Sequence, residues 1–478
     1  MPIARGLILA GAAALALPSA AGAETLRDAM AAAYANNPDL AAARAGQQAT
    51  SEQVVQQLGR IRPTVGAQVT LDQETSNPGT FDDFSRLVTI GTRLTQPVFR
   101  GGQVQNGIKG AKHRDAAGRE QLRATESQTM VDTVVAYMDV LRLQSEVELT
   151  ANQVKVLERQ LQASNDRFEV GDLTRTDVAQ SEARLALARS QNIAAEGNLA
   201  NAMSTYQRVV GRAPADLEPP PPLPELPATQ QQAIDLALAD NPSLLAAKKL
   251  QDAARSDVRV AKGARLPSID ATFQVGYTNF RGLTGAGGGV RQGGNDYTQN
   301  IGATMTIPLY QGGVQGSRIR EAEARSSQAE QNALGAERGA IAGARTAWED
   351  LQSARATIRS AKVAVDANTL ALEGTRAENE VGSRTILDVL DAEQELLNSR
   401  VTLVRAERDA YVAAYVLLAN IGKAEADDLG LAVDLYEPED YTRRAKRHIF
   451  DWAPGFSGRE VARPAPAVGP PVPANVEQ

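Results

Sequence analysis

Several residue types on which common kinds of site depend are absent or scarce in this sequence. The chain has 478 residues, no cysteine and 2 histidines. The absence of cysteine excludes disulfide frameworks, zinc ribbons, thiol nucleophiles and a cysteine-linked N-terminal lipid. Aromatic residues make up 4%, so a core of large rings is not expected and closely packed Ala-rich helices are. No stretch after the N-terminal segment has about 18 consecutive apolar residues, so no transmembrane helix is predicted.

Charge gives the sequence no obvious polyanionic partner. The formal net charge is −7 and no basic stripe stands out along the chain. Because nucleic-acid binding depends on such a positive footprint, we expect no nucleic-acid partner.

The N-terminus has the pattern of an export signal. Arg5 gives a positive start, Leu7 to Leu17 form a short apolar core, and Ala21-Gly22-Ala23 match a small-x-small cleavage site. Residues 1–23 are therefore predicted to be a signal peptide, and the mature chain is predicted to begin at Glu24.

The remainder is predicted to be a tandem duplication. Asn37-Pro38 recurs 204 residues later as Asn241-Pro242, whereas Gly101-Gly102 recurs 211 residues later as Gly312-Gly313. An ordered series at two constant spacings indicates one repeat at 24–213 and another at 228–422, with an inserted Gly-rich loop within 282–294. Residues 214–227 are a Pro-rich linker, and its consecutive prolines favour an extended strap.

Each repeat contains two segments in which apolar and polar residues alternate, as Val65, Ala67 and Val69 do. Strands are predicted at 64–75, 86–96, 268–280 and 297–307, each about long enough to cross an outer membrane when tilted. Alternation alone equally fits a soluble, half-buried sheet. Four strands cannot close a barrel, and an open edge in lipid leaves backbone groups unsatisfied. A membrane-spanning arrangement therefore requires several chains to pool their strands.

Very long helices follow the strands in both repeats. Residues 103–168 and 314–378 contain no proline, and at 1.5 Å per residue each is roughly 100 Å long. Such lengths are typical of coiled coils. Gly171 and Gly382 suit left-handed C-caps, so helices at 174–211 and 385–421 are predicted to return as antiparallel partners.

Together these features resemble the TolC family of bacterial outer-membrane channel-tunnels. The resemblance covers about 26–429 and depends on the duplication and on three phrases. These are Leu94-Thr95-Gln96-Pro97-Val98-Phe99-Arg100-Gly101-Gly102, Ile307-Pro308-Leu309-Tyr310-Gln311-Gly312-Gly313, and Val381-Gly382-Ser383-Arg384-Thr385 leading into Asp388-Val389-Leu390-Asp391-Ala392.

The resemblance implies a fold class and a set of partners. The fold would be an α+β membrane protein, in which four strands per chain enter a 12-stranded barrel of a homotrimer and the helices form a periplasmic tunnel. The protein would contact outer-membrane lipid, a periplasmic adaptor and an inner-membrane transporter of the ABC or the proton-driven RND type. It would act as a passive exit duct in the outer membrane, without catalysis, cofactor or metal.

The resemblance also implies site residues at the tunnel entrance. Asp388 and Asp391 match the family's two entrance aspartates, and their i,i+3 spacing places both on one helix face. Converging carboxylates attract cations and raise each other's pKa. Arg384 matches an arginine that bonds to a Thr-Asp pair, here Thr176 and Asp177, and holds the entrance shut. Asn379 replaces a tyrosine of the family's latch. On its own, Asp388 also fits a helix N-terminal acid favoured by the macrodipole.

Two other classes of protein were weighed. For an enzyme, no HExxH, GxSxG or Walker A motif is present. A soluble periplasmic coiled-coil adaptor would explain the helices but not four strands with apolar faces. Residues 423–478 are predicted to be a largely disordered extension, the earlier part of which wraps the outside of the tunnel. The cargo is left open between secreted proteins and drugs, with dedicated metal efflux disfavoured.

Overall fold

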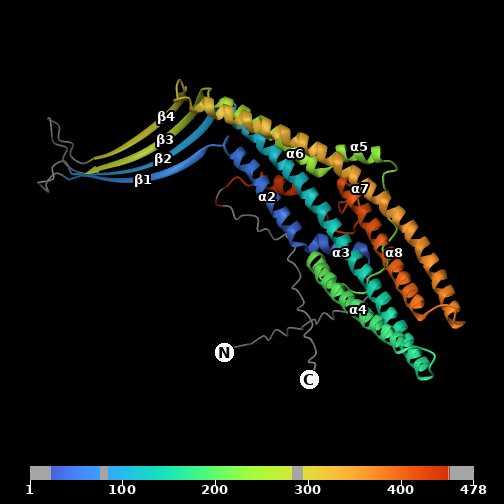
Figure 1. Ribbon diagram of the computed structural model, residues 1–478. Coiled ribbons are helices and arrows are strands. Elements are labelled where there is room, and N and C mark those ends of the chain that lie inside the picture. The colour runs from blue at the N-terminus through green and yellow to red at the C-terminus, as the bar shows by residue number, and fades with distance from the viewer. Residues whose placement is uncertain (1–22, 76–83, 282–293, 451, 453–478) are drawn as a thin grey trace, which may run out of the picture.

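The protein is an elongated molecule with a sheet at one end and long helices running away from it (Figure 1). The computed structural model describes residues 23–75, 84–281, 294–450 and 452. The predicted signal peptide up to residue 22, the Gly-rich loop at 282–293 and the last part of the C-terminal extension lie outside the described residues.

The described elements follow the predicted order in both repeats. The first repeat contains α1 (Leu26–Asn36), α2 (Pro38–Gly59), β1 (Thr64–Thr75), β2 (Phe84–Arg100), α3 (Gln103–Glu169) and α4 (Arg175–Val210). The second contains α5 (Gln230–Asp240), α6 (Pro242–Gly263), β3 (Ser268–Arg281), β4 (Gly294–Thr306), α7 (Val314–Glu380) and α8 (Ile386–Asn420). A short helix, α9 (Pro438–Ala445), follows the second repeat.

The four strands form one antiparallel sheet in the order β1-β2-β3-β4, so β1 and β4 are its edges. Side chains along a strand alternate between the two faces, and the pairing register aligns residues of one kind across all four strands. On one face, an apolar row across the four strands consists of Val65, Leu94, Phe273 and Ile301. The adjacent row, on the opposite face, is polar or glycine and consists of Gly66, Arg93, Gln274 and Asn300.

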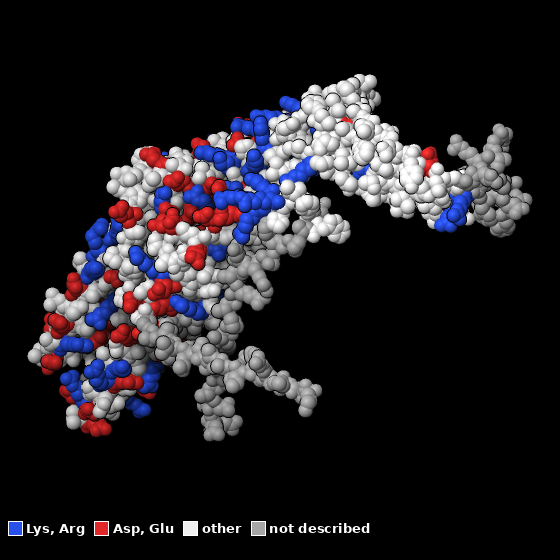
Figure 2. Space-filling model, turned by 180° about the vertical axis from the view of Figure 1, so that it is seen from behind, with Lys and Arg blue, Asp and Glu red and all other residues white. Residues whose placement is uncertain are grey.

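The apolar face of the sheet is not covered by any of the residues that the structure describes. Ile301 is 83% exposed and Val69 is 69% exposed. Figure 2 shows that the sheet is nearly free of charged side chains on the visible face, whereas both signs of charge are scattered over the helices. A soluble half-buried sheet would pack its apolar face against a core, so the described chain does not fit that alternative.

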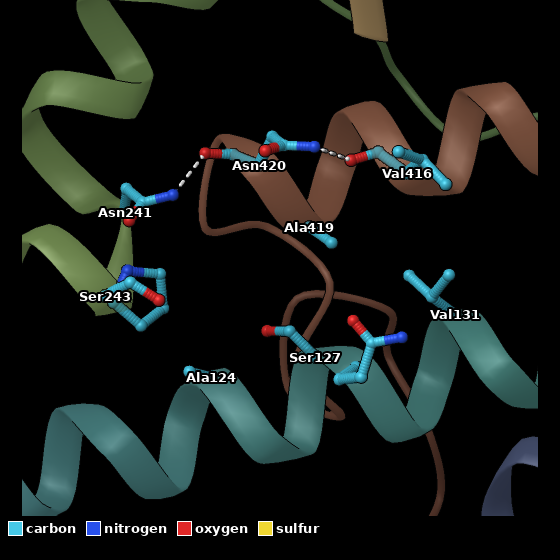
Figure 3. A pocket seen from close by; sticks show the side chains of 10 residues that line it. Ala124, Ser127, Val131, Asn241, Ser243, Val416, Ala419 and Asn420 are labelled. Carbon is cyan, nitrogen blue, oxygen red and sulfur yellow. Dashed lines mark hydrogen bonds between the residues drawn. The ribbon is translucent and has the colours of Figure 1, made fainter. Parts of the chain in front are cut away.

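The two Asn-Pro pairs break the first helix of each repeat in the same way. Asn37 and Asn241 are the N-caps of α2 and α6, and each is followed by a proline at the first helical position, where a missing N–H costs nothing. The side-chain amide of Asn37 donates to Val209 O (3.1 Å), and that of Asn241 donates to Asn420 O (2.9 Å; Figure 3). Each asparagine therefore also fastens the short helices to the end of the repeat's last long helix.

The long helices pair as two hairpins, α3 with α4 and α7 with α8 (Figure 1). Among the helices that the structure describes, none has the length and hydropathy needed to cross a membrane. All six glycines predicted at turns have positive φ: Gly101, Gly102, Gly171, Gly312, Gly313 and Gly382. At Gly101 an added Cβ would lie 2.3 Å from Gly263 O, so both backbone conformation and space require glycine there.

The main hydrophobic core lies midway along the helices. Large buried side chains from α1, α3, α4, α7 and α8 meet there, among them Tyr137 and Tyr206. The Pro-rich strap crosses this level, and Glu218 O lies 2.7 Å from the Tyr137 hydroxyl. The buried carboxylate of Glu24 accepts a hydrogen bond from the Tyr206 hydroxyl and pairs with Arg212 (2.8 Å). The predicted start of the mature chain is thus fixed to the same core.

The first part of the extension after the second repeat lies along the helices. Residues 423–450 are described, and α9 packs against α2. The Thr442 hydroxyl donates to Ser51 Oγ (3.1 Å), and Ser51 donates to the buried carboxylate of Asp115 (2.6 Å). The predicted disorder concerns mainly the last 20 or so residues, which lie outside the described residues, and it stays a prediction. The composition of the described part is polar, but a few side chains suffice to anchor it to a buried polar group.

Replacing Asn37 by alanine is expected to destabilise the protein by about 1–3 kcal/mol, because it removes a helix cap and leaves a buried carbonyl without its donor. Thermal unfolding of the purified protein in detergent should show a lower midpoint. Asn201→Ala is the matched control, since Asn201 is exposed on α4. Equal midpoints for the two variants would contradict the role given to Asn37.

Candidate functional site

The candidate site lies at the ends of the two hairpins, the part of the molecule farthest from the sheet (Figure 1). The chain reverses there at Gly171, between α3 and α4, and at Gly382, between α7 and α8. Their φ angles are +82° and +79°, values that only glycine adopts at little cost. The duplication therefore brings two similar turns to the same end of the molecule.

Each returning helix starts with a capping box. In α8, the Thr385 hydroxyl and backbone N–H donate to Asp388 Oδ2 (2.7 and 2.9 Å), and the Asp388 N–H donates back to Thr385 Oγ1 (3.3 Å). Thr174 and Asp177 make the same contacts at the start of α4. These reciprocal bonds satisfy backbone donors that a helix start otherwise leaves free.

Both capping aspartates keep their charge to lower pH than usual. Hydrogen bonds from the hydroxyl and the backbone N–H of Thr385 lower the pKa of Asp388, and those from Thr174 lower the pKa of Asp177. In the single chain, the pKa of Asp388 thus shifts in the direction opposite to that expected from converging carboxylates. The expectation of a helix N-terminal acid is met by the same residue.

Asp391, the second predicted entrance residue, is held by an ion pair. Its Oδ1 accepts from Arg184 Nη2 at 2.5 Å. Because Arg184 is on α4 and Asp391 on α8, this pair ties the two hairpins together near their ends. Sequence analysis did not identify Arg184, since its partner lies in the other repeat and no motif marks it.

The predicted pair between Arg384 and Asp177 is not formed within the described chain. Arg384 Nε instead donates to Glu378 Oε2 (2.8 Å), and the Asn379 side chain donates to Arg384 O (2.8 Å). Asp177 is engaged in its own cap, and Thr176 is exposed. The bonds of Arg384 and Asn379 therefore stabilise the turn between α7 and α8, and they do not reach the other hairpin.

A small core positions the hairpin ends. All four long helices contribute buried side chains to a cluster behind the turns, among them Leu157, Leu185, Leu372 and Val389. Beside this cluster the nearly buried carboxylate of Glu393 on α8 pairs with Arg376 on α7. The aspartates are therefore carried by packed helices, and what the hairpin ends offer chemically is fixed charge at defined places.

The pocket drawn in Figure 3 lies away from the hairpin ends, between α3, the start of α6 and the end of α8. Its volume is about 260 Å³, and it is lined by neutral side chains such as Ser127, Asn241 and Asn420. Among the residues in the described ranges, no group of three or more His, Asp or Glu is placed to bind a metal ion.

The fold and the charged hairpin ends define a class of protein. An edge-open sheet with an uncovered apolar face, joined to paired helices of 67 residues, is the protomer architecture of outer-membrane channel-tunnels. Residues 29–212 and 233–423 match the family model described as outer membrane efflux protein. The chain belongs to this family, which also includes the TolC proteins. It is accordingly an outer-membrane channel protein and not an enzyme.

Similar proteins cover almost the whole chain. Outer membrane efflux protein BepC of Brucella suis is 35% identical over 93% of this chain and 94% of its own length. Alkaline protease secretion protein AprF of Pseudomonas aeruginosa is 28% identical over 68% of each chain. The solved structure of the outer membrane protein VceC of Vibrio cholerae shares the fold, with a TM-score of 0.72, 21% identity and coverage of 83% of this chain and 96% of that one.

The ion pair between Arg184 and Asp391 is expected to restrain the hairpin ends. Arg184→Gln should therefore raise single-channel conductance in planar bilayers, and Asp391→Asn should raise it to a similar extent. Arg189→Gln is the control, because Arg189 pairs with Glu158 inside the α3–α4 hairpin and does not join the two hairpins. Conductance that rises equally in the control, or in none of the variants, would contradict this role.

Proposed function

We propose that three copies of this chain form a pore through the outer membrane that continues as a tunnel through the periplasm. The observation that carries the proposal is the sheet: among the described residues, its apolar face is exposed and both its edges are unpaired. A sheet in lipid must satisfy every backbone N–H and C=O, which only closure achieves.

The strand order is compatible with such closure. In an antiparallel sheet of four strands, β4 runs opposite to β1. β4 of one copy can therefore pair antiparallel with β1 of the next, and three copies give the 12 strands of the family's barrel. The apolar row would face lipid and the polar row, which contains Arg93 hydrogen-bonded to Gln274 (2.9 Å), would face the lumen.

The helices extend this pore toward the inner membrane. The 67 residues of α3 span roughly 100 Å, enough to cross much of a periplasm. The proposed function is a passive exit duct for an inner-membrane transporter, of the ABC or the RND type, joined through a periplasmic adaptor. BepC is named as an efflux protein and AprF as an alkaline protease secretion protein. Small molecules and secreted proteins are the two cargo classes proposed.

At the hairpin ends, three copies would converge their aspartates into an acidic entrance. Asp388 stays ionised to a lower pH than an ordinary aspartate because its pKa is lowered, whereas part of the charge of Asp391 is compensated by Arg184. We therefore assign Asp388 the larger share in attracting cations, with Arg384, Thr176, Asp177 and Asn379 framing the two turns. Polyvalent cations should block the pore from this side.

The lipid-facing assignment predicts opposite results for two neighbouring residues. Ile301→Arg places a charge on the apolar face and should destabilise the membrane-inserted form by about 2–4 kcal/mol. Asn300→Arg places the same charge on the polar face and should instead change the ion selectivity of the pore. Urea unfolding of the protein in vesicles and conductance in planar bilayers measure the two effects. If both variants lost stability equally, the assignment of faces would be refuted.

The cation site predicts a pH dependence. A lowered pKa means that Asp388 stays charged, and its cap intact, until the pH falls through that lowered value. Thr385→Val removes the main cause of the shift, so block of the current by hexaamminecobalt(III) should be lost at a higher pH than in the parent. Thr174→Val alters the equivalent cap in α4 and should leave the pH of half-block unchanged. A midpoint that moves equally in both would exclude Asp388 as the principal site.

A further inference from the structure

The helical ends that adjoin the sheet carry an excess of positive charge. Four segments where helices meet strands contain 11 Lys or Arg and no Asp or Glu, although the net charge of the chain is −7. These segments are residues 58–64, 97–114, 258–267 and 307–320. Figure 2 shows Lys and Arg side chains gathered on the helical part where it meets the sheet. We call these residues the basic belt: Arg60, Arg62, Arg100, Lys109, Lys112, Arg114, Arg259, Lys262, Arg265, Arg318 and Arg320.

Most of the basic belt is not neutralised by the protein itself. Three members form ion pairs: Arg100 with Asp270, Arg114 with Asp257, and Lys262 with Glu323. For the other eight, no ion pair occurs among the residues that the structure describes. Seven of the eight are exposed and Arg62 is half-buried. Uncompensated cations at this density repel one another, so the arrangement is one that an external anion would stabilise.

Exposed apolar side chains lie in the same connecting segments. Leu309 is 92% exposed, Tyr310 is 87% exposed and Val98 is 63% exposed, and Phe99 and Leu266 are also exposed. Apolar and tyrosine side chains next to lysine and arginine are typical of the level where a membrane protein passes from hydrocarbon to headgroups.

The distance from the strands places the basic belt at that level. Arg62 precedes β1 by two residues and Arg265 precedes β3 by three, which at about 3.3 Å per residue is within roughly 10 Å of the strand starts. Lys109 lies six residues into α3, or about 9 Å along that helix. A membrane interface is several ångströms thick on each side of the hydrocarbon, so these cations are within reach of lipid phosphates.

We propose that the basic belt binds the phosphate headgroups of anionic phospholipids in the leaflet nearest the helices. This inference rests on the proposed function, because it requires the sheet to span the membrane. The lipid is favoured over an anionic cargo in the lumen because exposed apolar side chains, Leu309 and Tyr310 among them, lie in the same segments as the belt. Bound headgroups would fix the height of the barrel in the membrane and the start of the tunnel below it.

The test compares two triple variants that lose the same charge. The belt variant carries Arg60→Gln, Arg62→Gln and Arg265→Gln. The α7 variant carries Arg355→Gln, Arg359→Gln and Lys362→Gln, which remove three exposed cations about 60 Å along α7 from the sheet. Each protein is reconstituted in phosphatidylcholine vesicles with spin-labelled phosphatidylglycerol or spin-labelled phosphatidylcholine, and the relative association of the two probes is measured. Planar-bilayer conductance is recorded for all three proteins.

The parent and the α7 variant should prefer phosphatidylglycerol, and this preference should weaken at 1 M salt, where screening is strong. The belt variant should lose much of the preference, by up to about fivefold for each removed cation that contacts lipid. Equal preference in the two variants overturns the proposal, and an altered ion selectivity of the belt variant would then place these cations in the lumen. A parent that inserts and fails to conduct contradicts the proposed function instead.

Discussion

The structure depends on one constraint: a four-stranded sheet with an apolar face cannot satisfy its edges or cover that face alone. Within the described chain, β1 and β4 each have one unpaired edge, and side chains such as Ile301 are almost fully exposed. Lipid can cover the face, but only further strands can satisfy the edges. Assembly with other copies is therefore a requirement of the sheet itself, and the tunnel formed by the helices follows from it.

The duplication explains how one chain supplies both ends of this assembly. Two copies of a helix-strand-strand-helix-helix unit place four strands at one end and two hairpin turns at the other (Figure 1). The same local interactions recur in both copies. Asn37 and Asn241 each donate a side-chain hydrogen bond to the end of a long helix, and Asp177 and Asp388 each belong to a capping box.

Local features of the fold were predictable from the sequence, because they depend on short-range rules. Residues within a few positions of one another determine the strand periodicity, the Asn-Pro breaks and the helix ends at Gly171 and Gly382. The order of elements follows from these local features. β2 extends four residues further than predicted, to Arg100, because an irregularity in the register at Pro97 and Phe99 lets the strand continue past a proline.

Features that depend on distant residues were not predictable. The ion pair of Arg184 with Asp391 joins positions 207 residues apart, and Arg384 pairs with Glu378 of its own hairpin instead of Asp177. The docking of α9 follows from a buried network around Asp115 that no pattern reveals. The basic belt escaped detection for the same reason, because its members come from four separate segments that only the fold brings to one level.

The most direct test that three chains combine their strands in one barrel is the mass of the assembly. Native mass spectrometry of the purified protein, released from detergent micelles, should give a single species with the mass of three mature chains. A stable monomer, or an assembly of another number of chains, would contradict the closure of β1 on β4 between three copies.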